Sequence, residues 1–194
     1  MKKQNMTKCL SAIFMASFTI PAFAHTGAGA AHSFMDGFAH PWLGIDHVLV
    51  MFSIGLWGCL QGGKQIWLLP MTFLLWIMAG AALGFTNINL PYPELWVALS
   101  VVSCGLLVGN NLKINSVLAM VLVALFAISH GYVHATEIAE NANKANYVSG
   151  FLVATTILHC LGITAGLFDA KAFKTLRVCF GLLCTAVGVL LLAG

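Results

Sequence analysis

The chain has 194 residues, of which 60% are hydrophobic and only 8% are charged, and its mean hydropathy is +0.92. Soluble domains carry about 25% charged residues, so this composition cannot cover a water-facing surface and excludes a soluble globular protein. Lipid must therefore be the solvent for most of the chain. The apolar runs are long and continuous, which indicates α-helices rather than the short alternating strands of a membrane barrel.

The first residues have the pattern of a secretory signal peptide. Three lysines precede a short apolar stretch, and the tripeptide Ala-Phe-Ala that ends at Ala24 fits a cleavage site. We predict a signal peptide at residues 1–24 and a mature chain that begins at His25. The formal charge of +3 then comes from the leader lysines, so no basic surface is left for nucleic acid. An uncleaved first helix is the alternative.

Six apolar stretches follow, and each is long enough to cross a hydrocarbon core about 30 Å thick. Short polar and turn-forming clusters separate them and leave no room for a further domain. We therefore expect an all-α polytopic membrane protein, with a single six-helix transmembrane bundle in residues 25–194 and a short periplasmic N-terminal arm. The predicted spans are 43–61, 66–86, 94–110, 113–133, 147–168 and 175–193.

The basic residues predict the orientation of these spans. A cleaved signal peptide places His25 outside, and an even number of spans returns the C-terminus to the same side. Lysine and arginine residues concentrate in the three loops that this topology makes cytoplasmic, as the positive-inside rule requires. Of the basic residues after the leader, only Lys144 lies in an outer loop. The sequence thus predicts a bacterial inner-membrane protein with both termini in the periplasm.

Glycine spacing predicts close helix packing, and the cysteine spacing limits the kinds of site. Three glycine pairs have the G-x-x-x-G spacing that lets helix backbones approach closely. We interpret them as packing within one chain, and a contact between copies in a homo-oligomer is the alternative. The cysteines form no C-x-x-C pair, which argues against a redox or cysteine-rich zinc site. The three pairs are Gly80 and Gly84, Gly105 and Gly109, and Gly162 and Gly166.

None of the seven histidines lies in a predicted cytoplasmic loop. The first cluster runs from His40, just before the first span, to Asp46 and His47, about one turn inside it. A charged side chain in the membrane costs about 2.5–3.5 kcal/mol on insertion scales. Asp46 and His47 therefore need a partner or a ligand. A hydrogen bond between them that only ties helices together is the alternative interpretation.

The second cluster contains His130, His134 and Glu137 at the outer end of the fourth span. His130 and His134 are four residues apart, so they share one helix face, which Glu137 continues. Imidazole and carboxylate groups together suit nickel, cobalt, zinc or copper. His159, near the middle of the fifth span, is a third candidate, with Thr155 one turn before it as a residue that orients the ring. Histidines that only bond helices to one another are the alternative.

These motifs resemble the HupE/UreJ family of hydrogenase and urease accessory membrane proteins. The resemblance rests on the start at His25, the H-P-x4-D-H block from His40 to His47, and the H-G-x-x-H-x-x-E block from His130 to Glu137. It also rests on the block that ends at His159. The resemblance implies a six-span permease for nickel or cobalt that is not an enzyme and holds no tightly bound cofactor.

We expect a route of capture followed by transfer. His25, His32 and His40 on the N-terminal arm would collect a periplasmic divalent ion, which is the partner we expect besides the lipid bilayer. Side chains at the outer mouth would then strip its water, and His159 would be the next stop inward. These mouth residues are Asp46, His47, His130 and His134, with Glu137 beside them.

Three other classes of protein remain open at this point. Three histidines and an aspartate could hold zinc and activate water, as in an intramembrane metal hydrolase, although no H-E-x-x-H motif is present. Paired histidines could ligate a b-type haem. The last alternative is a membrane protein that binds metal without transporting it.

Overall fold

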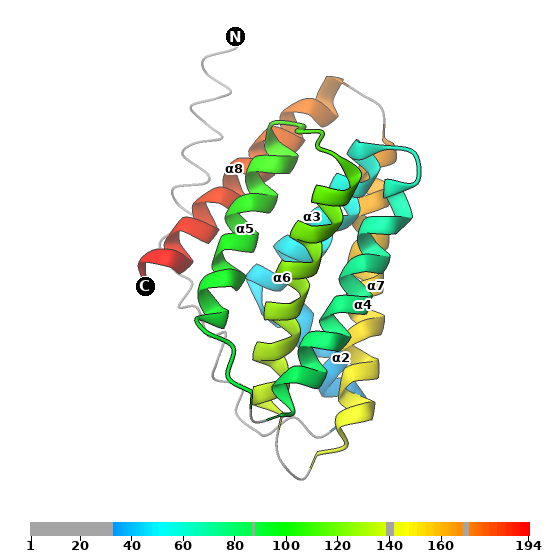
Figure 1. The fold of residues 1–194 in the computed structure, drawn as a ribbon. Helices are drawn as coiled ribbons and strands as arrows, with labels where there is room; N and C mark the ends of the chain where they lie inside the picture. The colour runs from blue at the N-terminus through cyan, green and yellow to red at the C-terminus, as the bar shows by residue number, and fades with distance from the viewer. Residues whose placement is uncertain (1–32, 87, 139–141, 169–170) are drawn as a thin grey trace.

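A computed structural model of the chain describes residues 33–86, 88–138, 142–168 and 171–194 (Figure 1). The predicted signal peptide, His25 and His32 lie outside these residues. Every regular element in the described ranges is a helix, as the composition predicts. The helices are α2 (Phe34–Leu43), α3 (Ile45–Gln61), α4 (Gln65–Gly84), α5 (Pro93–Gly109), α6 (Ser116–Glu137), α7 (Lys144–Leu167) and α8 (Lys171–Ala193).

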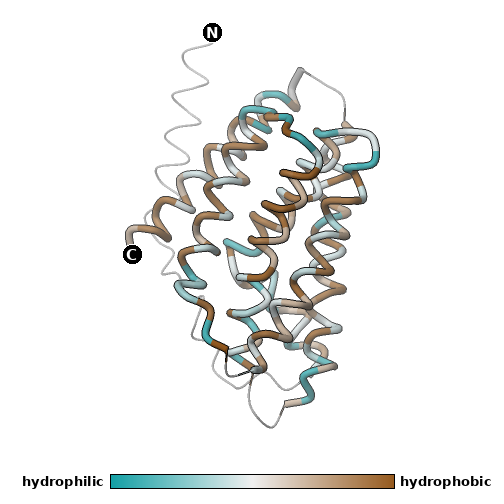
Figure 2. The backbone as a smooth tube through the Cα atoms, viewed as in Figure 1, coloured by the Kyte–Doolittle hydropathy of each residue, from teal (hydrophilic) through white to brown (hydrophobic). Residues whose placement is uncertain are grey.

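Several of these helices have the length and apolarity of membrane spans. Four pass by themselves, namely α4, α6, α7 and the part of α8 from Phe173 to Ala193, and the bent pair α2 and α3 passes when the two helices are taken together. Helix α5 is apolar but has only 17 residues. Figure 2 shows hydrophobic residues along the helices and hydrophilic residues mainly near their ends. The chain is therefore a multi-pass membrane protein, and the number of six spans stays a prediction.

The first predicted span, 43–61, corresponds to α3, and the helix α2 precedes it across a sharp bend. The axes of α2 and α3 differ by 86° across Gly44, whose backbone is extended (φ −91°, ψ 118°). Pro41 lies inside α2. The part of the N-terminal arm that the structure describes is thus a helix. Ser33 caps this helix by accepting a hydrogen bond from the Asp36 amide.

Helix α7 packs against both α2 and α3. Gly150 of α7 lies so close to the Phe34 carbonyl of α2 that a Cβ would collide with it, and Gly162 has the same relation to Phe52 of α3. Such approaches let helices pack without intervening side chains. Helices α4 and α6 form a second closely packed pair, and α5 and α8 a third (Figure 1). The six glycines of the predicted G-x-x-x-G pairs all face neighbouring helices of this chain.

Four of the basic residues lie near one end of the bundle, at the ends of helices or in the loops between them. Lys64 and Lys113 line one pocket there. Lys174 and Arg177 line another, next to Asn110 and Asn111 in the loop that continues to Lys113. The Arg177 guanidinium also donates a hydrogen bond to the Val108 carbonyl at the end of α5 (2.7 Å). This arrangement agrees with one common side for the three loops that we predict to be cytoplasmic.

Candidate metal centre

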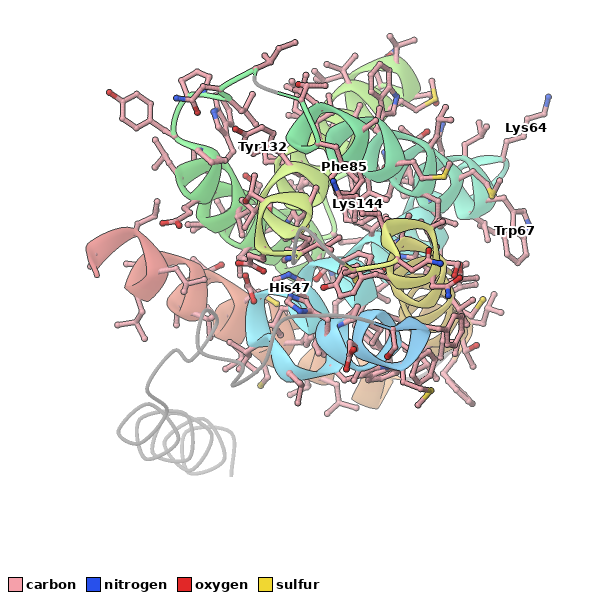
Figure 3. The ribbon with its side chains drawn as sticks, turned by 90° about the horizontal axis from the view of Figure 1, so that it is seen from below. His47, Lys64, Trp67, Phe85, Tyr132 and Lys144 are labelled. Carbon is pink, nitrogen blue, oxygen red and sulfur yellow. The ribbon has the colours of Figure 1, made fainter. Side chains whose placement is uncertain are left out.

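Three histidines from three helices come together in the interior of the bundle. His40 of α2, His47 of α3 and His134 of α6 each offer one ring nitrogen, and the three nitrogens lie within 4.8 Å of one another. We call them the histidine trio. His47 and His134 are buried, 4% and 5% exposed, whereas the side chain of His40 is 25% exposed. Figure 3 shows His47 in the interior, whereas Lys64 and Trp67 lie at the periphery.

The Asp46 carboxylate orients the ring of His47. The Nδ1–H of His47 donates to Asp46 Oδ1 at 2.6 Å, so the lone pair of this ring is on Nε2. Asp46 lies in the first turn of α3, where the positive end of the helix dipole stabilises a carboxylate. A histidine whose second nitrogen donates to a carboxylate is the usual arrangement around protein-bound metals.

The Glu137 carboxylate lies close to the other two rings of the trio, those of His134 and His40. Its Oε2 lies 3.4 Å from Nδ1 of His134 and 3.8 Å from Nε2 of His40. The Glu137 side chain is 28% exposed, so it lies at the mouth of the cluster. With Nδ1 of His134 turned to the carboxylate, Nε2 of His134 points into the trio. There it faces Nε2 of His47 directly.

This facing pair of nitrogens defines the chemistry of the site. With Nδ1 of each ring bonded to a carboxylate, both Nε2 atoms carry lone pairs, and two lone pairs directed at one point repel. A shared proton or a metal cation between them removes the repulsion. Because His40 and two carboxylates adjoin the pair, the donor set is the one that divalent transition metals prefer.

Gly44 makes room for the Asp46–His47 pair. A Cβ at Gly44 would lie 2.6 Å from Nδ1 of His47 and 2.9 Å from Oδ1 of Asp46. The hydrogen bond between these side chains therefore folds back over the helix break, where only a glycine leaves enough space. The bend at Gly44 thus has a direct role in the geometry of the site.

A cavity of about 260 Å³ adjoins the trio, and Glu94 is part of its wall. Asp46, His47, His134 and Glu137 line the same cavity. Glu94 lies in the first turn of α5, and our sequence interpretation did not include it. The signal was a carboxylate at the outer start of a predicted span, where a charge is costly and commonly functional. The cavity therefore presents three carboxylates to an approaching cation.

The other predicted site residues lie apart from the trio or outside the described residues. The His130 ring packs against the His47 ring at 5.3 Å between centroids, but its Nε2 bonds to Ser100. His159 lies deeper, with Nδ1 bonded to the Met51 carbonyl. The Thr155 hydroxyl contacts Met51 and the Phe151 carbonyl, so our prediction that it orients His159 is wrong.

Comparison with known proteins shows the family of the chain. The sequence model of the HupE / UreJ protein family matches residues 13–191. The curated protein named Protein HupE from Rhizobium leguminosarum bv. viciae is 38% identical over 182 residues, which cover 93% of this chain and 95% of that protein. The chain belongs to the HupE/UreJ family. No solved structure matches the chain significantly.

HupE/UreJ membership removes one of the alternatives. The family is associated with nickel or cobalt accessory functions of hydrogenase and urease. Its members are accessory transport proteins and not enzymes. The expectation that the chain is not an enzyme is confirmed by this membership, and the intramembrane hydrolase interpretation is thereby removed.

Proposed function

We propose that this protein is an inner-membrane permease that imports a divalent transition metal, nickel or cobalt, from the periplasm for metalloenzyme maturation. The observation that carries the proposal is that Nε2 of His47 and Nε2 of His134 face each other. Nδ1 of each of these rings is hydrogen-bonded to a carboxylate. Three imidazoles with carboxylates suit these metals and not magnesium or calcium, which prefer oxygen ligands.

The proposed direction rests on the distribution of charge. In a six-span topology with a cleaved signal peptide at residues 1–24, the carboxylate-lined cavity opens to the periplasm and the basic end faces the cytoplasm. Carboxylates at the mouth concentrate cations by their field. The membrane potential favours inward movement of a doubly charged ion by about 4.6 kcal/mol per 100 mV. In this proposal the metal is the transported substrate and no cofactor is held permanently.

In the proposed transport step, each residue of the site has one task. His40, which is partly exposed, meets the hydrated ion first, together with Glu137 and Glu94 on the cavity wall. The buried Nε2 atoms of His47 and His134 then replace its water ligands. Asp46 keeps the His47 ring in the ligating tautomer, and the carboxylate also offsets part of the positive charge. His25, in the segment before the described residues, would act in the same capture step.

The proposal is tested by uptake of radioactive nickel and cobalt in cells that lack their own importers. The wild-type protein, His134→Ala and Thr156→Ala are produced at equal levels. Thr156 is exposed on α7 and outside the site, so it is the matched control. We expect uptake with wild type and Thr156→Ala and none with His134→Ala. Equal uptake with all three, or no uptake above empty cells, would contradict the proposal.

A further inference from the structure

Two histidine nitrogens outside the trio are buried and have no hydrogen-bond partner in the described part of the chain. They are Nδ1 of His130 and Nε2 of His159. The residues are 0% and 1% exposed. A buried polar atom without a partner costs about 1–3 kcal/mol. Two such atoms next to a cluster of histidines therefore point to a ligand that is not part of the chain.

The partners of the opposite nitrogens define the tautomer of each ring. Nδ1–H of His159 donates to the Met51 carbonyl at 2.7 Å, which leaves Nε2 with the lone pair. The Ser100 hydroxyl donates to the Val97 carbonyl at 2.6 Å, so it accepts from Nε2–H of His130 at 3.0 Å. Nδ1 of His130 therefore also carries a lone pair. Each ring is thus neutral and has one nitrogen lone pair available for a metal. Its other nitrogen donates a hydrogen bond to a protein oxygen, as is usual for metal-binding histidines.

The two rings lie in sequence from the trio towards the inner part of the bundle. The His130 ring is 5.3 Å from the His47 ring. The Phe73 ring is 6.0 Å from the His130 ring and 5.2 Å from the His159 ring, and Phe73 is fully buried. A row of ring contacts thus connects the trio to His159 through His130 and the apolar Phe73.

We propose, on the basis of the proposed function, that Nδ1 of His130 and Nε2 of His159 are successive inner ligands of the transported metal and that Phe73 is the gate between them. Each inner step offers fewer imidazoles than the trio, so the ion binds there more weakly. Weak consecutive sites are what conduction requires, because an ion that binds too tightly does not leave. The apolar ring between them prevents a continuous column of water.

Two substitutions separate a ligand role from a structural role. His159→Asn keeps a side-chain N–H close to the position of Nδ1, so it preserves the bond to Met51, but it removes the Nε2 lone pair. His130→Gln keeps an N–H close to the position of Nε2 for Ser100 and removes the Nδ1 lone pair. A purely structural role is preserved in both variants. A ligand role is lost in both.

The experiment combines Co2+ titration of the purified full-length protein, read by visible absorption, with nickel and cobalt uptake in cells. For wild type we expect a tight binding step at the trio and a weaker second step. Each variant loses the part of this weaker binding that its own ring supplies and uptake falls about tenfold or more, while the tight step and the melting temperature stay unchanged. Phe73→Leu, a smaller apolar side chain, keeps both binding steps and raises uptake.

The outcomes distinguish failure of this proposal from failure of the proposed function. Wild-type uptake with both isosteric variants indistinguishable from wild type would overturn the inner ligands and leave the permease intact. Weaker Co2+ binding that each variant reduces, without uptake in any protein, would support the inner ligands and contradict transport. Loss of the tight step or of thermal stability in the isosteric variants would make the two rings structural and overturn the proposal. A fall in uptake in Phe73→Leu would contradict the gate.

Discussion

Nε2 of His47 and Nε2 of His134 face each other although the two residues are 87 positions apart in the chain. Each ring has its Nδ1 turned to a carboxylate, at 2.6 Å for Asp46 and 3.4 Å for Glu137. Helices α3 and α6 thus place two nitrogen lone pairs opposite each other, and His40 of α2 contributes a third ring nitrogen close to them.

Removal of His47 weakens metal binding more than removal of His40. His47 is buried, whereas His40 is partly exposed, so water replaces a lost His40 ligand more readily. We expect His47→Ala to lower nickel affinity by about tenfold or more and His40→Ala to lower it less. Isothermal titration of the purified proteins measures both. A larger loss of nickel affinity with His40→Ala than with His47→Ala would contradict the prediction that the more buried histidine is the stronger ligand.

Asp46→Asn tests the orientation of the His47 ring. The amide has the volume of the carboxylate but no charge, and its N–H2 group favours the wrong tautomer of the imidazole. We expect nickel affinity to fall about 10–100-fold, as for other partners of metal-binding histidines. Asp46→Glu keeps the charge and should lose less. Equal affinities of Asp46→Asn and wild type would show that the carboxylate does not position the ring.

Gly44→Ala disturbs the site without removing any ligand. The new Cβ would lie 2.6 Å from Nδ1 of His47, so the ring and the Asp46 carboxylate must move apart. We expect a loss of nickel affinity comparable to that of Asp46→Asn. Gly109→Ala is the control, because the nearest atom to its Cβ would be 3.3 Å away and belongs to Gly181, far from the trio. Unchanged affinity in Gly44→Ala would contradict the close approach.

Glu94→Gln tests the cavity that leads to the trio. Glu94 lines this cavity with Asp46 and Glu137, and a carboxylate there raises the local concentration of divalent cations. We expect metal association to slow severalfold at low ionic strength and the difference to shrink as salt is added. Stopped-flow measurement of Co2+ binding gives this rate. Glu94→Asp retains the charge and should bind at nearly the wild-type rate.

The sequence predicted the helices well because long apolar stretches form helices in lipid whatever their partners are. The predicted span 66–86 corresponds to α4 (Gln65–Gly84), and 147–168 corresponds to α7 (Lys144–Leu167). The helix α2 before Gly44 was missed because its 10 residues are too few for a membrane span, so they were assigned to the arm. Its position depends on α7, which contacts both α2 and α3.

The residues of the site were only partly predictable. Spacing within one helix relates His134 to Glu137, and both lie in the observed cluster. His40 was expected on an arm outside the membrane, but the bend at Gly44 turns α2 back so that His40 joins the trio. Glu94 could not be placed beside Asp46 from the sequence, because only the packing of α5 against α3 brings them to one cavity.

The most direct test of the permease is metal flux into proteoliposomes that contain only the purified protein. An imposed inside-negative potential and a nickel-sensitive dye inside the vesicles report entry, with His47→Ala vesicles as the matched control. We predict saturable entry of nickel or cobalt with the wild-type protein and background entry with His47→Ala. Tight binding of the metal by the wild-type protein with no entry above protein-free vesicles would contradict transport by this chain alone.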